Sequence, residues 1–182
     1  MPRRISVLAV IALSALLTSA KAAEPVPTNG DFAGLIKIGG ARKLYLECSG
    51  AGVPIVILEA GLRNRGDIWS VKPDAGAAVF PEVADFTRVC AYDRPGTTLG
   101  ADQFSRSDSV PTPRTTADAV ADLHALLGAA AIPPPYVLAG HSTGGLIARL
   151  YASTYPKEVA GLVLTGLPPR AATMCRSKSR NW

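Results

Sequence analysis

The chain has 182 residues, of which 48% are hydrophobic and 18% are charged, and its formal net charge is +5. This length and composition indicate one globular domain and exclude a disordered protein. Seven of the 19 basic residues lie in residues 1–22 and 170–182, where no acidic residue occurs. The body between these ends therefore carries slightly more acidic than basic residues, which excludes a basic nucleic-acid-binding surface.

Residues 1–22 are predicted to be a signal peptide. Arg3 and Arg4 provide a positive start, residues 5–17 are apolar, and Ala20-Lys21-Ala22 has the small-x-small pattern that signal peptidase cleaves. The apolar stretch is too short for a stable membrane span. We expect cleavage near Ala22 and export to the periplasm or the medium.

The remaining chain predicts an α/β fold. After a linker over residues 23–32, strands are expected at 35–38, 43–48, 54–58, 88–92, 136–139 and 159–164, and helices at 116–127 and 143–155. The first two strands flank Gly39-Gly40 as in a β-hairpin. Alternation of strands and helices indicates a mostly parallel sheet with helices on both faces. Residues 100–114, rich in Ser, Asp, Pro and Thr, predict a long surface loop.

Three cysteines occur, at Cys48, Cys90 and Cys175. Cys48 ends one predicted strand and Cys90 lies within another, so they could form a disulfide if those strands pair in antiparallel fashion. Two buried thiols are an equal alternative, because spacing does not fix connectivity. No His or Cys cluster has the spacing of a zinc site, so we expect neither a metal nor a cofactor.

The segment Gly140-His141-Ser142-Thr143-Gly144 is a G-x-S-x-G motif between a predicted strand and a predicted helix. That setting is required of a nucleophile elbow, in which a sharp turn presents the serine hydroxyl above the sheet. The two glycines leave room where chain segments crowd together. We therefore predict Ser142 as the nucleophile and the backbone N–H of Thr143 as one oxyanion donor.

A second segment, Leu58-Glu59-Ala60-Gly61-Leu62, follows a predicted buried strand and leads into a polar turn. We predict the backbone N–H of Leu62 as the other oxyanion donor. The alternative is an ordinary strand-ending turn, in which glycine is common.

These segments, together with Cys90–Gly96 and Tyr155–Leu164, resemble the α/β-hydrolase superfamily over about residues 33–167. Members that look similar include carboxylesterases, lipases and proline-iminopeptidase-like peptidases. The resemblance implies a hydrolase acting on a small-molecule ester or amide. It also implies that Asp93, Arg94 and Gly96 form a structural turn without a catalytic role.

The resemblance further implies an acidic residue and then a histidine after the serine, because a serine hydroxyl needs a base to become nucleophilic. No Asp, Glu or His follows Glu158. We interpret the two histidines, His124 and His141, as structural. The sequence therefore suggests a partial hydrolase domain over residues 33–169, followed by a disordered basic tail over residues 170–182.

Three explanations remain open: a truncated or frame-shifted product, which we favour, a non-catalytic relative, or a half that another chain completes. The expected reaction is hydrolysis of a carboxylic ester through an acyl-serine, with this chain inactive or weakly active. The alternatives are a hydrolase-like binding protein and a proline-iminopeptidase-like peptidase in the full-length ancestor.

Overall fold

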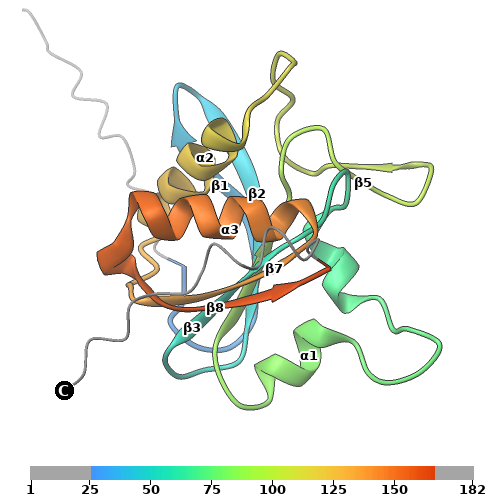
Figure 1. Cartoon of the computed structure of the whole chain (residues 1–182), viewed down its shortest axis with the longest axis vertical. Coiled ribbons are helices and arrows are strands. Elements are labelled where there is room, and N and C mark those ends of the chain that lie inside the picture. Colours follow the sequence, from blue (N-terminus) through green and yellow to red (C-terminus); the bar gives the residue numbers. More distant parts are fainter. Residues whose placement is uncertain (1–25, 167–182) are drawn as a thin grey trace, which may run out of the picture.

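The computed structural model describes residues 26–166. Its main sheet has six strands in the order β1-β2-β4-β3-β7-β8, and β5 and β6 form a separate two-stranded sheet (Figure 1). The strands are β1 Phe32–Gly39, β2 Arg42–Ser49, β3 Ile55–Glu59, β4 Val89–Tyr92, β5 Thr98–Leu99, β6 Gln103–Phe104, β7 Tyr136–His141 and β8 Val159–Thr165. The helices are η1 Gly66–Ser70, α1 Val79–Ala84, α2 Thr116–Ala129, α3 Thr143–Thr154 and η2 Pro156–Glu158.

The predicted α/β architecture is confirmed. β2 runs antiparallel to both β1 and β4, whereas β4, β3, β7 and β8 run parallel to one another. The turn between β1 and β2 contains Gly39, Gly40 and Ala41, all with positive φ, as a tight hairpin turn requires. Because parallel strands end at one edge of a sheet, β3 and β7 deliver the residues that follow them to the same place.

Helices cover both faces of the sheet, as predicted. α2 and α3 lie together on one face (Figure 1), where they bury Leu123, Leu126 and Tyr151 against the main core. η1 and α1 cover the other face, where Leu58, Val89 and Ala91 form a smaller core. The sequence reading missed η1 and α1, which are short and carry no helical period of apolar residues.

Helix α2 begins directly after a capping residue, Thr115. Thr115 caps it, since its hydroxyl accepts from the Asp118 N–H at 3.1 Å while the Asp118 carboxylate accepts from the Thr115 N–H at 2.7 Å. The helix continues through Gly128 to Ala129, beyond the end at residue 127 that the sequence predicted. Gly128 has no positive φ, so it does not act as a left-handed cap.

The segment predicted as a long loop, residues 100–114, includes β6 and is fixed to the domain. The Arg106 guanidinium donates to both carboxylate oxygens of Asp93 at 2.8 Å, and the Ser107 hydroxyl donates to the Asp93 carbonyl at 2.6 Å. The segment therefore has a defined path even though most of it has no regular secondary structure.

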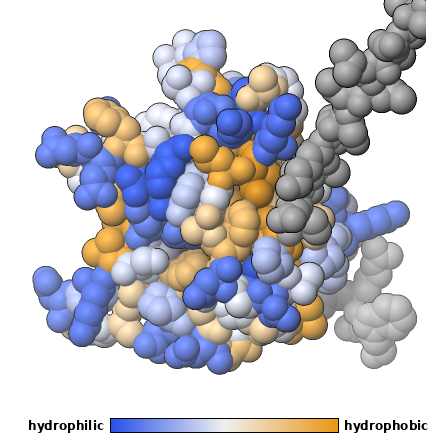
Figure 2. Space-filling model, turned by 180° about the vertical axis from the view of Figure 1, so that it is seen from behind, coloured by the Kyte–Doolittle hydropathy of each residue, from blue (hydrophilic) through white to orange (hydrophobic). Residues whose placement is uncertain are grey.

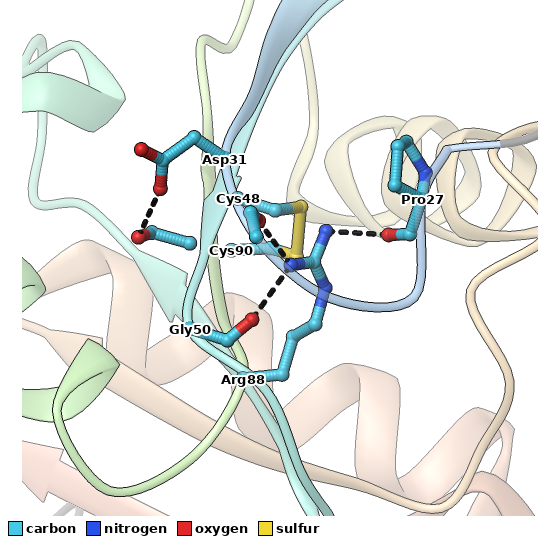
Figure 3. The surroundings of a disulfide bond; sticks show 8 residues. Pro27, Asp31, Cys48, Gly50, Arg88 and Cys90 are labelled. Atoms are coloured by element: carbon cyan, nitrogen blue, oxygen red, sulfur yellow. Dashed lines mark hydrogen bonds between the residues drawn. A yellow bond between two sulfur atoms is a disulfide. The ribbon is translucent and has the colours of Figure 1, made fainter.

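The described part of the predicted linker is also held against the domain. Val26 is 5% exposed and lies in the main core. The guanidinium of Arg88, a buried residue, donates to the carbonyls of Pro27, Gly30 and Gly50 at 2.6–2.9 Å (Figure 3). These bonds satisfy a buried cation with three backbone carbonyls, which anchors the segment before β1.

Cys48 and Cys90 form a disulfide, which settles the question that the sequence left open. The two residues face each other in the antiparallel pairing of β2 with β4, and both are almost fully buried. The bridge lies beside Arg88 (Figure 3) and joins the hairpin strands to the parallel part of the sheet.

Apolar surface remains exposed on the face covered by α1. A hollow of about 450 Å³ there is lined mainly by apolar residues, among them Val53, Val79, Phe86 and Val163. From behind, the molecule shows apolar patches between hydrophilic side chains (Figure 2). Within residues 26–166, no helix has the length and apolar character that crossing a membrane requires.

We predict that replacing both Cys48 and Cys90 with alanine lowers the free energy of unfolding by about 4 kcal/mol. The bridge spans a sequence separation of 42 residues and restricts the conformations of the unfolded chain. Its removal raises the entropy of the unfolded chain, and the value given is the one expected for a loop of this length. Urea unfolding followed by circular dichroism measures it. Cys175→Ala serves as the control, and an equal loss in that variant would contradict the assignment.

Candidate active site

Ser142 occupies a strained turn between β7 and α3. Its φ of 53° and ψ of −122° lie in a region that non-glycine residues rarely adopt. The Ser142 N–H donates to the Thr165 carbonyl at 2.8 Å, and the Ser142 carbonyl accepts from the Gly145 N–H at 2.9 Å. The predicted strand–turn–helix arrangement is therefore confirmed, with the backbone fixed on both sides of the serine.

The glycines of the motif are required by close backbone contacts. A Cβ on Gly140 would lie 2.7 Å from the carbonyl atoms of Gly144. A Cβ on Gly144 would lie 2.5 Å from the Ala60 carbonyl oxygen and closer still to that of Glu59. The first turn of α3 thus touches the backbone that follows β3, and only glycine permits this approach.

Both predicted oxyanion residues line one cavity of about 240 Å³. Leu62 comes from the turn after β3, and Thr143 is the first residue of α3, directly after Ser142. N–H groups in the first turn of a helix have no intrahelical acceptor and are free to bind an anion. The fold therefore brings together two residues that lie 81 positions apart in the sequence.

The turn that carries Leu62 is held by a buried polar cluster of Glu59, Tyr92 and Arg94. The Arg94 guanidinium forms an ion pair with Glu59 and donates to the Ala60 carbonyl at 2.7 Å and to the Gly61 carbonyl. The Tyr92 hydroxyl donates to the other Glu59 carboxylate oxygen at 2.5 Å. Arg94 thus fixes the direction of the peptide groups just before Leu62.

Burial dominates the electrostatics of this cluster. Desolvation raises the pKa of Glu59, while the charge of Arg94 and the hydrogen bonds from Tyr92 and Arg94 oppose that rise. Desolvation also raises the pKa of Tyr92, and the neighbouring Glu59 carboxylate adds to that effect. The sequence reading missed this cluster. The Glu59 carboxylate directly before the turn was its one visible signal.

Asp93 has the structural role that the family resemblance implied. Besides accepting from Arg106, its carboxylate accepts from the Gly66 N–H at 3.0 Å, and the residue is fully buried. Burial tends to raise its pKa, but the hydrogen bonds from Arg106 and Gly66 outweigh burial, so the pKa of Asp93 is lowered. The carboxylate therefore holds η1 and the loop after β6 as a charged acceptor.

Both histidines, interpreted as structural from the sequence, contact other residues of the described chain. The ring of His141 lies against Gly61 and Gly166, where a Cβ would come within 2.9 Å of its nitrogens. His124 contacts Glu158 at 3.2 Å and stacks on Tyr155 with ring centroids 3.9 Å apart. Along α3, Tyr155 is roughly 20 Å from Ser142, since a helix rises about 1.5 Å per residue.

Within residues 26–166, no histidine or carboxylate is hydrogen-bonded to the Ser142 hydroxyl. The same part of the chain contains no group of three His, Cys, Asp or Glu side chains that could hold a metal ion. The described site therefore combines a strained serine with two candidate N–H donors, without a bound base.

Comparison with known proteins gives consistent results. The model of the alpha/beta hydrolase family matches residues 50–180. The pimeloyl-(acyl-carrier protein) methyl ester esterase of Chromobacterium violaceum is 34% identical over 129 residues, which cover 70% of this chain and 42% of that protein. The proline iminopeptidase of Neisseria meningitidis is 30% identical over 156 residues, which cover 82% of this chain and 43% of that protein.

Among solved structures, Cfl2 from Burkholderia cenocepacia superposes with a TM-score of 0.61 and 26% identity, covering 76% of this chain and 43% of that one. The chain thus spans about two fifths of the length of the curated relatives that it matches.

The backbone contact at Gly144 predicts a matched pair of helical variants. Gly144→Ala should lower the free energy of unfolding by about 3 kcal/mol, because the new methyl group overlaps the carbonyls after β3. Gly128→Ala in α2 meets nothing within 4 Å and should raise it by about 0.5–1 kcal/mol. Thermal unfolding measures both, and equal effects would contradict the close contact.

The Glu59–Arg94 pair predicts a pH-dependent loss of stability in Arg94→Met. Arg94 opposes the rise in the pKa of Glu59, so its removal moves the folded-state pKa further above the unfolded value. At acidic pH, Glu59 of the variant is protonated, and this contribution to the free energy of unfolding is fully present. The contribution is lost as pH rises through the folded-state pKa of Glu59. Its deficit against the unmodified chain should reach about 3–5 kcal/mol at neutral and basic pH and shrink on acidification.

Urea unfolding across the acidic to slightly basic range checks this dependence. The double variant Glu59→Gln/Arg94→Met is the control, since it has no carboxylate to titrate there. A deficit in Arg94→Met that does not change with pH would contradict the role of Arg94.

Proposed function

Because the chain belongs to the α/β-hydrolase family, we propose that it is a serine hydrolase that cleaves carboxylic esters through an acyl-serine at Ser142. The observation that carries this proposal is the strained Ser142 turn directly before Thr143, which shares a cavity with Leu62. A serine hydroxyl presented near the backbone N–H groups of Leu62 and Thr143 is suited to acyl transfer.

In the proposed reaction, the Ser142 Oγ attacks the ester carbonyl carbon and its proton passes to a base. The negative charge that develops on the carbonyl oxygen is stabilised by the N–H groups of Leu62 and Thr143. The alkoxide leaves with a proton and is released as the alcohol. Water then attacks the acyl-serine, which releases the acid and restores the hydroxyl.

Arg94 acts here as a positioning residue. Its bonds to the carbonyls of Ala60 and Gly61 orient the peptide groups that lead to the Leu62 N–H. An oxyanion donor is effective only when it is aimed before the charge develops, so a fixed turn is part of the proposed mechanism.

We propose low turnover for the 182-residue chain by itself. No Asp, Glu or His follows Glu158 in the sequence, and His124 and His141 have other neighbours. Without a base, a serine hydroxyl remains a weak nucleophile, although oxyanion stabilisation retains part of the rate enhancement.

Ester cleavage is preferred over amide cleavage on the basis of the relatives. The methyl ester esterase matches at 34% identity, and the proline iminopeptidase matches at 30%. A small-molecule ester is therefore the proposed substrate, with a peptidase activity as the alternative.

We also propose that the protein is exported after removal of residues 1–22. The pattern of those residues and the Cys48–Cys90 disulfide support this location, because disulfides persist in oxidising compartments.

A non-catalytic binding protein is the rival function. The absence of a base bonded to Ser142 within the described residues favours it. In that case the cavity would hold a ligand without acylation, and the strained turn would be an inherited feature of the fold.

A fluorophosphonate probe separates the two functions. We expect slow covalent labelling of the chain, located at Ser142 by peptide mass spectrometry and abolished in Ser142→Ala. Ser153→Ala is the matched control, because Ser153 lies exposed on α3 with its hydroxyl bonded to the Arg149 carbonyl. Complete absence of labelling in the folded chain would favour the binding protein.

A further inference from the structure

The cavity beside Ser142 is lined by more positive than negative side chains. Arg63, Arg94 and Arg114 line it together with one acidic residue, Asp122. The other lining residues are uncharged. A neutral ester would need only apolar contacts and the two N–H donors. The excess of guanidinium groups is therefore not required for binding a neutral ester.

Two of these arginines have structural partners. Arg94 is paired with the buried carboxylate of Glu59. Arg114 donates to Asp122 at 2.7 Å, but the same carboxylate also accepts two hydrogen bonds from Arg42, at 2.8 and 3.0 Å. The single negative charge of Asp122 therefore neutralises only one of the two positive charges on Arg42 and Arg114. A net positive charge remains at this side of the cavity.

Arg63 has no such partner. Its side chain is exposed and forms no hydrogen bond or ion pair with any residue of the described chain. It follows Leu62 directly and has a φ of +65°, and its carbonyl accepts from the Thr98 N–H at 2.6 Å. The backbone is thus fixed while the guanidinium remains available at the cavity.

We propose that the acyl group bound in this cavity carries a carboxylate, which the Arg63 guanidinium binds, with the positive charge of Arg114 in support. This substrate class rests on the proposed function at Ser142. Guanidinium groups match carboxylates in geometry and in charge.

The size of the cavity limits the acyl group. At about 240 Å³ it is smaller than the roughly 300–1,000 Å³ of sites that hold drug-sized ligands. The substrate class that fits is therefore a half-ester of a short dicarboxylic acid. The ester carbonyl would lie at the Leu62 and Thr143 N–H groups, and the free carboxylate would lie at Arg63.

Calorimetric titration of the Ser142→Ala chain tests this binding without any turnover. Monomethyl succinate carries one carboxylate, and dimethyl succinate is its neutral counterpart. We expect the half-ester to bind at least roughly tenfold more tightly than the diester, as one charge-assisted hydrogen bond would provide. Its affinity should also fall as ionic strength rises, whereas that of the diester should not.

Arg63→Gln in the same background should remove this preference. Lys72→Gln is the matched control, because Lys72 is exposed and lies outside the cavity lining, so its replacement removes one positive charge elsewhere. Equal affinity for the two esters, or an unchanged preference in Arg63→Gln, would overturn the proposal.

The outcome is independent of the labelling experiment. If the half-ester binds selectively and Ser142 is not labelled, the anion site stands and the hydrolase function fails. If Ser142 is labelled and the two esters bind equally, the hydrolase function stands and the carboxylate-bearing substrate is excluded.

Discussion

The close contact between the chain after β3 and the first turn of α3 is the constraint on which the rest of the site depends. At Gly144 the two backbones approach so closely that no side chain fits between them. This contact sets where α3 begins relative to the sheet, and therefore where Ser142 must turn. It also places the Leu62 turn next to Thr143, so one packing contact determines both sides of the cavity.

The buried Glu59–Arg94 pair supports this contact by fixing the chain after β3. A charged pair in a protein interior is a weak source of stability, because desolvation offsets most of the attraction. Its geometric effect is more important here. Arg94 binds the carboxylate of Glu59, the last residue of β3, and the carbonyls of Ala60 and Gly61, the two residues after it, which leaves that turn little freedom. The family's turn after β4 thus supports the site without taking part in the chemistry.

The sequence predicted the six strands of the main sheet, the two long helices and the Ser142 turn, because buried strands and amphipathic helices leave local periods of apolar residues. It did not predict the short strands β5 and β6. It could not predict contacts that depend on register. Cys48 and Cys90 meet only because β2 and β4 pair at that position, and Arg94 reaches Glu59 only because β3 lies beside β4. Helix α1 was missed because it is only six residues long and contains a proline, so no apolar period could develop.

The disulfide encloses β3 and the turn after it within a covalent ring that runs from Cys48 to Cys90. Residues 71–77, between η1 and α1, are exposed and belong to this ring. A protease that cut there would leave the two fragments joined through the sulfur atoms, with the sheet still holding them in register. Cleavage in this exposed stretch of the ring would therefore not separate the Leu62 turn from the β7–α3 turn that carries Ser142.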